Sequence, residues 1–342
     1  MSNQVVSIIT PSYNRADIIQ ETADSIFSQT YPHWEWVIVD DGSTDNSWEV
    51  LEGYAKKDNR VKIFKRNREP KGAAACRNIA IENATGNYLI FLDTDDVLAS
   101  FCLQQRVDAA QQDPQFDFIV FPMLLFKRQP DDQGMLWNID KDEDEVNRLL
   151  LGDPLCQGTG TIWKKESFVR VGMWNEKLLL WQDIELHLRS LLQGVTFKKR
   201  MDLLPDIFLR ISDDSLSRVG YHSLPKLQSR ANVFVQIVNS IFEKNKQVDY
   251  RKGMRNMGAD IITSAIHSNH FLEATNLIIF SSSKGIFTKE ESKLLKSYLL
   301  NRKYKLYKIP FLGKPIKKKI DLLVPRVNST LGIIKYTQKI NV

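Results

Sequence analysis

Residues 88–96 read YLIFLDTDD, an apolar run that leads directly into a cluster of three carboxylates. Five apolar or aromatic residues bounded by polar ones are typical of a buried strand, because a helix needs a longer segment. The stretch therefore predicts a strand over 88–92 that ends in an acidic turn. In open parallel sheets, ligands bind at the carboxyl ends of strands, so this turn is a candidate site.

Upstream of this stretch, short apolar runs alternate with segments of helical periodicity. The runs at 5–10, 36–39 and 61–64 predict strands. The segments at 16–27, 46–55 and 72–82 predict helices. Strands and helices in alternation indicate an α/β domain with a mainly parallel central sheet flanked by helices.

Downstream of the acidic turn the pattern is less regular. The sequence predicts helices over 101–112 and 183–192 and strands over 116–121 and 161–163. Gly194 is placed to end the second helix. The polar, acidic stretch 129–144 is predicted to be a mobile surface insertion.

Beyond about residue 224 the chain is predicted to be helical and basic, which divides it into a domain over 1–224 and a C-terminal region over 225–342. The net charge of +6 conceals a strong asymmetry. Residues 1–230 hold 27 Lys and Arg against 34 Asp and Glu, whereas residues 231–342 hold 20 against 7. A segment this basic suits an anionic partner, and a solvated helical face is the simplest alternative.

Residues 292–320 carry ten Lys or Arg and no acidic residue, interleaved with Leu, Tyr, Ile and Phe. This mixture indicates association with an anionic membrane surface, and a contact between copies of the chain is the alternative. A nucleic-acid partner is disfavoured, because the region has no recognisable nucleic-acid motif and the acidic N-terminal part would repel phosphates.

Several sequence patterns are absent from the chain, and their absence excludes further classes of protein. No apolar run reaches the roughly 18 residues of a membrane span, and the N-terminus lacks the features of a secretory signal, so we expect a cytoplasmic protein. The three cysteines, Cys76, Cys102 and Cys156, are widely spaced and predict neither disulfides nor structural zinc. The chain also lacks the glycine fingerprints of dinucleotide-binding and P-loop proteins and the nucleophile elbow of hydrolases.

Polar residues follow three of the predicted strands, at 10–14, at 40–41 and at 93–96. Each loop alone has an ordinary explanation as a turn or a helix cap. Their coincidence at one edge of one sheet favours a binding site. Three carboxylates within four residues repel one another unless a cation lies among them. Mg²⁺ or Mn²⁺ typically takes one or two carboxylates together with substrate phosphates, so the cluster predicts a metal–diphosphate site.

Four segments in order carry a more specific signal: VSIITPSYNRADIIQETADSIFSQTY, WVIVDDGSTDNS, RNIAIENATGNYLIFLDTDD and VGMWNEKLLLWQDIELHLRSLLQG. Over about residues 5–220 they resemble glycosyltransferase family 2, the inverting enzymes with the GT-A nucleotide-diphospho-sugar transferase fold. The resemblance implies an enzyme that moves a sugar from a nucleotide-diphospho-sugar, by default a UDP-sugar, to an acceptor hydroxyl.

The resemblance also implies roles for individual residues. The nucleotide-sugar is expected to contact Pro11, Tyr13, Arg15, Asp40, Asp41, Arg77, Asp93 and Thr94. The divalent metal, Mn²⁺ or Mg²⁺, is expected at Asp95 or Asp96, with Asp93 as a further ligand or a ribose contact.

Asp183 matches the family's catalytic base, which takes the proton of the acceptor hydroxyl. Its alternative role is that of a carboxylate at a helix N-terminus. The residue before it is Gln182, where the family usually has Glu. A second departure follows Arg210, where related sequences often have His and this chain has Ser212 and two aspartates, so a role for His222 is speculative.

Three tryptophans, Trp163, Trp174 and Trp181, are acceptor-side candidates, with Trp181 and Gln182 nearest to Asp183, although packing in the core is the commoner fate of Trp. The expected acceptor is a saccharide, lipid-linked or part of a growing surface polysaccharide, reached from the inner face of the cell membrane. The alternatives are a soluble or protein acceptor, or a non-catalytic nucleotide-sugar-binding protein. The histidines His187, His267 and His270 are expected to be ordinary surface residues.

Overall fold

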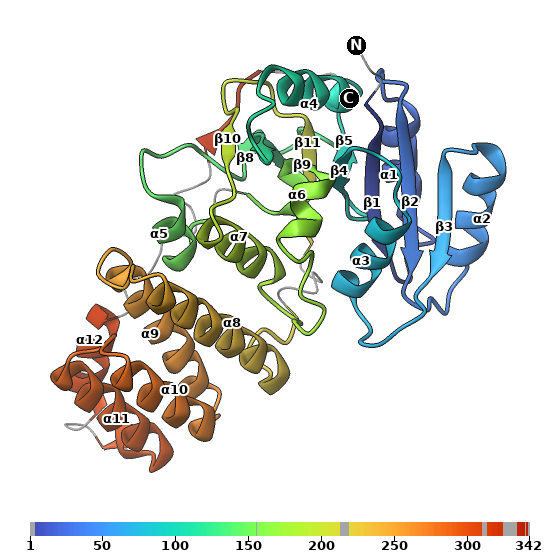
Figure 1. Ribbon diagram of the computed structural model, residues 1–342. Coiled ribbons are helices and arrows are strands. Elements are labelled where there is room, and N and C mark those ends of the chain that lie inside the picture. Colours follow the sequence, from blue (N-terminus) through green and yellow to red (C-terminus); the bar gives the residue numbers. More distant parts are fainter. Residues whose placement is uncertain are drawn as a thin grey trace.

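The computed structural model describes residues 4–154, 156–212, 219–309, 313–323, 334–338 and 340. Figure 1 shows a part rich in strands next to a stack of helices, α8 to α12, coloured from gold to red. The strand-rich part is built from the N-terminal two thirds of the chain. The helical part follows it in sequence.

The main sheet has seven strands in the order β10-β6-β9-β4-β1-β2-β3. Four of them run parallel to one another: β1 (Val6–Ser12), β2 (Trp34–Asp40), β3 (Val61–Lys65) and β4 (Tyr88–Phe91). The strand β9 (Thr161–Lys164) lies antiparallel between β4 and β6 (Phe118–Val120), and β10 (Phe197–Lys199) is parallel to β6. The predicted α/β class with a mainly parallel sheet is confirmed.

The helices between these strands are α1 (Ile19–Phe27), α2 (Ser47–Lys57), α3 (Ala73–Asn83) and α4 (Cys102–Gln112). The expected helix over 16–27 begins later than predicted. Asn14 has a positive φ of 51°, and the Arg15 amide donates to the Ser47 hydroxyl at 2.7 Å. These residues therefore form a loop held against α2, and α1 begins at Ile19.

A second sheet, in the order β12-β8-β7-β11-β5, adjoins the first. It consists of β5 (Val97–Leu98), β7 (Met123–Phe126), β8 (Met135–Leu136), β11 (Ile207–Arg210) and β12 (Ile334–Lys335). The strand β12 comes from the far C-terminal part of the chain and pairs with β8.

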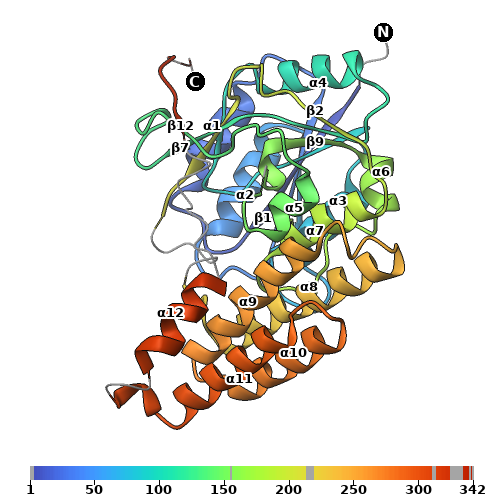
Figure 2. The ribbon, with the colours of Figure 1, turned by 90° about the vertical axis from the view of Figure 1, so that its left-hand side faces the viewer.

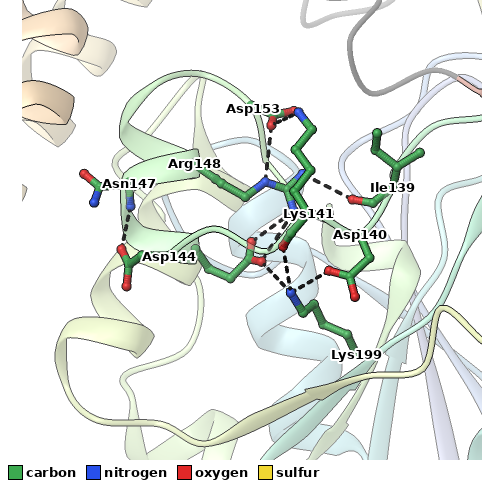
Figure 3. A network of polar contacts seen from close by, with 9 residues as sticks. Ile139, Asp140, Lys141, Asp144, Asn147, Arg148, Asp153 and Lys199 are labelled. Carbon is green, nitrogen blue, oxygen red and sulfur yellow. Dashed lines mark hydrogen bonds and ion pairs between the residues drawn. The ribbon is translucent and has the colours of Figure 1, made fainter.

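The segment 129–144 is more than the surface insertion that its composition predicts, because it contributes β8 to this sheet. Asn138 is 1% exposed; its side chain accepts from the Met123 amide and donates to the Phe121 carbonyl. Figure 3 shows the adjoining network of ion pairs. In it the buried Arg148 contacts Asp153, and Lys199 on β10 contacts Asp140 at 2.6 Å.

The C-terminal region consists of α8 (Leu224–Glu243), α9 (Arg251–His267), α10 (Phe271–Ser283), α11 (Lys289–Lys303) and α12 (Gly313–Leu323). Its predicted helical character is confirmed. Figure 2 shows α8 alongside α7 (Gln182–Leu192) and α9 near α5 (Glu145–Leu150). The apolar side chains of α5 and α7 share one hydrophobic core with these helices. The C-terminal region therefore packs directly against α7, the helix whose second residue is Asp183.

The three cysteines, Cys76, Cys102 and Cys156, are free and buried. In the part of the chain that the structure describes, no helix is both long enough and apolar enough to cross a bilayer.

Candidate active site

The loops that follow β1 and β2 lie side by side and are joined by hydrogen bonds. Ser12 and Asp40 are opposite one another in the sheet register. The Asp41 amide donates to the Ser12 carbonyl at 2.8 Å, and the Thr44 amide donates to the Asn14 side chain at 2.8 Å. This fixed pair of loops carries Pro11 at the end of β1 and the predicted contacts Tyr13 and Arg15 just beyond it.

The adjacent carboxylates Asp40 and Asp41 have different partners. Both oxygens of Asp40 are used within its own turn, where they accept from the amides of Gly42 and Ser43 and from the Ser43 hydroxyl. Asp41 uses one oxygen, Oδ1, which accepts from Arg66 Nε at 2.6 Å and from the Gly72 amide at 3.3 Å. Asp40 therefore shapes the loop, and Asp41 is the better candidate for a ligand contact.

Two basic residues at this end of the sheet were not predicted. Arg66 follows β3 and holds Asp41. The Lys71 ammonium lies 3.6 Å from the centroid of the Tyr13 ring, a cation–π contact on an exposed aromatic side chain. Their position in the sequence could have indicated them, because both follow a parallel strand at the edge of the sheet where the predicted site lies.

The acidic turn after β4 presents its carboxylates differently. Asp93 and Asp95 are half-buried, whereas Asp96 is 6% exposed and its Oδ1 accepts from the Arg210 amide at 3.0 Å. Arg210 Nε also donates to the Asp95 carbonyl at 3.0 Å. The side chain of Thr94, a predicted sugar-nucleotide contact, is buried. Asp96 is thus tied to β11, and Asp93 and Asp95 are the carboxylates at the surface of the turn.

The electrostatics of the turn favour a bound cation. Burial raises the pKa of Asp95, and the nearby charge of Asp93 raises it further, while Arg15 acts in the opposite direction. Burial, followed by the charges of Asp95 and Asp93, raises the pKa of Asp96 well above its ordinary value. A divalent cation among these oxygens would relieve the repulsion.

Within the described residues, no group of three or more His, Cys, Asp or Glu side chains is arranged to hold a metal. Mg²⁺ and Mn²⁺ sites that bind diphosphates commonly use only one or two protein carboxylates and complete their shell with phosphate and water. The half-buried oxygens of Asp93 and Asp95 fit that pattern. The expected metal site stays a prediction.

Arg77 connects this turn to the helix of Asp183. Its Nη2 donates to Asp93 Oδ1 at 2.6 Å, and its Nη1 donates to Gln182 Oε1 at 3.3 Å. The guanidinium carbon lies 4.8 Å from the ring centroid of Trp174. Burial lowers the pKa of Arg77, but the charges of Asp93 and Asp183 outweigh it and raise that pKa above its ordinary value. Arg77 therefore stays charged between the two acidic groups.

Asp183, on the second residue of α7, accepts a hydrogen bond from the Gly158 amide at 2.6 Å through Oδ1. A Cβ at position 158 would lie 3.1 Å from the Trp174 ring and 3.3 Å from that same oxygen. Gly158 was not predicted as a site residue. The sequence gives no local signal for it, because its partner lies 25 residues away.

The three tryptophans occupy different environments. Trp163 is 0% exposed and stacks on Phe118 at 4.1 Å between ring centroids, so it is a core residue and cannot contact an acceptor in this conformation. Trp174 is 2% exposed and packs edge-on against Phe91. Trp181, directly before α7, is half-buried and remains the acceptor-side candidate.

The histidines also differ from expectation. His187 is 3% exposed, beside Trp163 and the Cys156 sulfur, so its expected place on the surface is wrong. Burial lowers the pKa of this imidazole. His267 is exposed, as predicted, and contacts the Tyr298 hydroxyl. The aspartates that follow Ser212 lie outside the described residues.

The chain is similar in sequence and in fold to known glycosyltransferases. Residues 7–172 match the model of the family described as Glycosyl transferase family 2. The putative teichuronic acid biosynthesis glycosyltransferase TuaG of Bacillus subtilis is 44% identical over 104 residues, 30% of this chain and 41% of that protein. The UDP-Glc:alpha-D-GlcNAc-diphosphoundecaprenol beta-1,3-glucosyltransferase WfgD of Escherichia coli is 40% identical over 108 residues, 31% of this chain and 41% of that protein.

Solved structures extend the likeness to nearly the whole chain. Staphylococcus aureus TarS 1–349, in complex with UDP-GlcNAc, superposes with a TM-score of 0.65 at 17% identity and covers 92% of both chains. The Pyrobaculum calidifontis mannosyltransferase PcManGT, in complex with GDP-Man and Mn²⁺, gives a TM-score of 0.51 at 19% identity and covers 93% of this chain and 86% of that one. At such low identity these likenesses show a shared fold, which is the predicted GT-A fold. Residues 7–172, within which Arg77 donates to Asp93 in the acidic turn, therefore form a domain of glycosyl transferase family 2.

Proposed function

We propose that the protein is an inverting glycosyltransferase that moves a sugar from a UDP-sugar to an acceptor hydroxyl, with Asp183 as the general base. The observation that carries the proposal is the bridge made by Arg77, which contacts Asp93 and Gln182 at once. The bridge brings the donor-binding turn and the helix of the base together, although they are about ninety residues apart in sequence.

The donor would lie across the carboxyl ends of β1, β2 and β4. Asp41 accepts from the base of the nucleotide, and Tyr13 and Lys71 flank it. Arg77 is positioned to counter the negative charge that develops on the departing diphosphate, because its charge is buried and already oriented. A divalent metal, held by Asp95 and Asp93, would supply further charge neutralisation on the same diphosphate.

Asp183 receives the proton of the acceptor hydroxyl. The hydroxyl oxygen forms the new bond to the anomeric carbon, and the bond from that carbon to the diphosphate oxygen breaks, with its electron pair leaving on the nucleoside diphosphate. Attack from the face opposite the leaving group inverts the configuration. The Gly158 amide holds one oxygen of Asp183, which leaves the other oxygen for the acceptor.

The descriptions of two relatives support an acceptor class. TuaG is described as acting in teichuronic acid biosynthesis and WfgD as acting on a diphosphoundecaprenol-linked sugar. We therefore favour a lipid-linked saccharide or a growing surface polysaccharide over a soluble or protein acceptor. An enzyme with such an acceptor would work in the cytoplasm at the inner face of the cell membrane.

The C-terminal helices offer a surface for that membrane. Apolar side chains that are about 40–75% exposed there include Tyr304, Tyr307, Ile309 and Leu322. Exposed lysines lie among them at Lys303, Lys305, Lys308, Lys317, Lys318 and Lys319. Each basic residue near an anionic bilayer contributes about 1 kcal/mol to binding, and exposed apolar groups can insert shallowly.

A donor screen tests the proposal. Thermal unfolding of the full chain is measured with UDP-, GDP- and dTDP-sugars, each with and without Mn²⁺, because a ligand that binds the folded state raises the unfolding temperature. We expect UDP-sugars to stabilise the protein and Mn²⁺ to increase the effect. Stabilisation by GDP- or dTDP-sugars alone would contradict the UDP assignment, and the absence of any donor effect would contradict the transferase proposal.

A further inference from the structure

The turn that leads into the helix of Asp183 is backbone-strained. Trp181, two residues before Asp183, has φ 65° and ψ 29°, which is the left-handed region. A bulky residue other than glycine rarely adopts this conformation and keeps it only where the surroundings hold the chain in place. Something must therefore fix residues 178–181.

One hydroxyl from the C-terminal region holds this turn. Ser229, on α8, is 4% exposed, and its Oγ accepts from the amides of Leu179 and Leu180, each at 3.1 Å. The same hydroxyl donates to the Leu180 carbonyl at 2.9 Å. A hydroxyl has one donor and two acceptor positions, so Ser229 uses its full capacity on two adjacent residues of one turn.

Two further side chains, from α8 and from α7, lie against the same turn. The guanidinium of Arg230 lies 5.7 Å from the Trp181 ring and is fully buried. On the other side, Gln182 Nε2 donates to the Leu178 carbonyl at 2.7 Å. The turn is thus clamped between α8 and the first residue of α7.

We propose that Ser229 is a positioning residue for the transfer reaction. By fixing the backbone of residues 178–181, it fixes the start of α7 and thereby the orientation of the Asp183 side chain. The inference rests on the proposed role of Asp183 as the general base. It makes α8 part of the catalytic apparatus, and the basic C-terminal region therefore does more than provide a surface for a membrane.

The test compares Ser229→Ala with Ser240→Ala, a serine on the same helix nearer to its C-terminal end. Hydrogen exchange reports the turn directly, through the amides of Leu179 and Leu180. Steady-state kinetics report the consequence, as kcat and as KM for the donor. Ser229→Thr, which keeps the hydroxyl, serves as the conservative variant.

We expect Ser229→Ala to speed exchange at Leu179 and Leu180 by about tenfold or more and to lower kcat by about tenfold, with an unchanged donor KM, since small misplacements of reacting groups have large effects on rate. Ser240→Ala should resemble the wild type, and Ser229→Thr should recover most of the rate. A uniform loss of stability would instead speed exchange at amides throughout the fold, so faster exchange confined to this turn distinguishes the proposed role from a general loss of stability.

Unchanged exchange at the two amides would overturn the inference, and so would an unchanged kcat despite faster exchange. A wild-type protein without transferase activity would instead contradict the proposed function. The two failures are distinguishable, because hydrogen exchange is measured without turnover.

Discussion

Arg77 donates to Asp93 at 2.6 Å and thereby joins the acidic turn after β4 to the entrance of α7. The contact depends on the fork of the guanidinium, whose second nitrogen reaches Gln182. Lysine offers a single point of charge and cannot make both contacts from one position. The two contacts thus fix the acidic turn relative to the start of the helix that carries Asp183.

Replacement of this arginine is expected to impair turnover more than folding. For Arg77→Lys we expect kcat to fall about 100-fold, because one oriented donor to a developing charge is typically worth that much. The matched control is Arg60→Lys, at a partly exposed arginine that contacts Asp58 away from the site. Transfer rates at saturating donor measure the effect. An Arg77→Lys enzyme with the wild-type kcat would remove Arg77 from the mechanism.

A methyl group at position 158 is expected to displace the base. In Gly158→Ala the new Cβ meets both the Trp174 ring and the Asp183 carboxylate, so we expect kcat to fall by about 10- to 100-fold while UDP affinity is retained. Gly53→Ala on α2 is the control, because a Cβ there meets nothing within 4 Å. Titration calorimetry with UDP and initial rates give the two quantities. Equal kcat values for the two variants would contradict the close fit at Gly158.

The sequence predicts the strand ends well and the tertiary partners poorly. Residues 88–96 mark both β4 and the acidic turn, because an apolar run and its polar end are local features. The sequence predicts Trp163 on the acceptor side, but β9 lies between two strands and the Trp163 side chain is fully buried. Gly158 and Ser229 carry no local signal, since each acts on a turn or helix about 25 to 50 residues away.

The stability of the sheet is expected to depend on pH through Glu35. Burial alone would raise the pKa of this carboxyl, but hydrogen bonds from Lys62, Ser7 and Thr85 lower it to about 2. Because its pKa is lower in the folded state, the Glu35 carboxylate stabilises the folded protein at pH values above its unfolded-state pKa, near 4.5. This stabilisation is lost as the pH falls toward 2.

For Glu35→Gln we expect the free energy of unfolding at pH 7 to fall by about 3 kcal/mol, from the size of the shift. The difference from the wild type should shrink as the pH is lowered from 4.5 toward 2. Urea unfolding at pH 7 and pH 3 measures it, with Glu52→Gln on the surface of α2 as the control. A difference that stays constant with pH would show that the carboxylate charge is not what stabilises this site.

The lysines of α12 are expected to contribute to membrane binding. We expect Lys317→Gln, Lys318→Gln and Lys319→Gln together to weaken binding to vesicles of anionic lipid by about 3 kcal/mol at low salt, with little change for neutral vesicles. Removal of three exposed lysines near α2, Lys56, Lys57 and Lys65, is the control for net charge. Co-sedimentation with vesicles gives the affinities. Equal losses in both triple variants would contradict a localised binding surface.

The proposed role of Asp183 as general base is tested by the rate of sugar transfer by Asp183→Asn at saturating UDP-sugar, Mn²⁺ and acceptor. Asparagine preserves the shape of the side chain and the contact with Gly158 but cannot take up the proton of the acceptor. We expect kcat to fall by about 10²- to 10⁴-fold, the range for a general base, while UDP binding is unchanged. Transfer by Asp183→Asn at the wild-type rate would contradict this role.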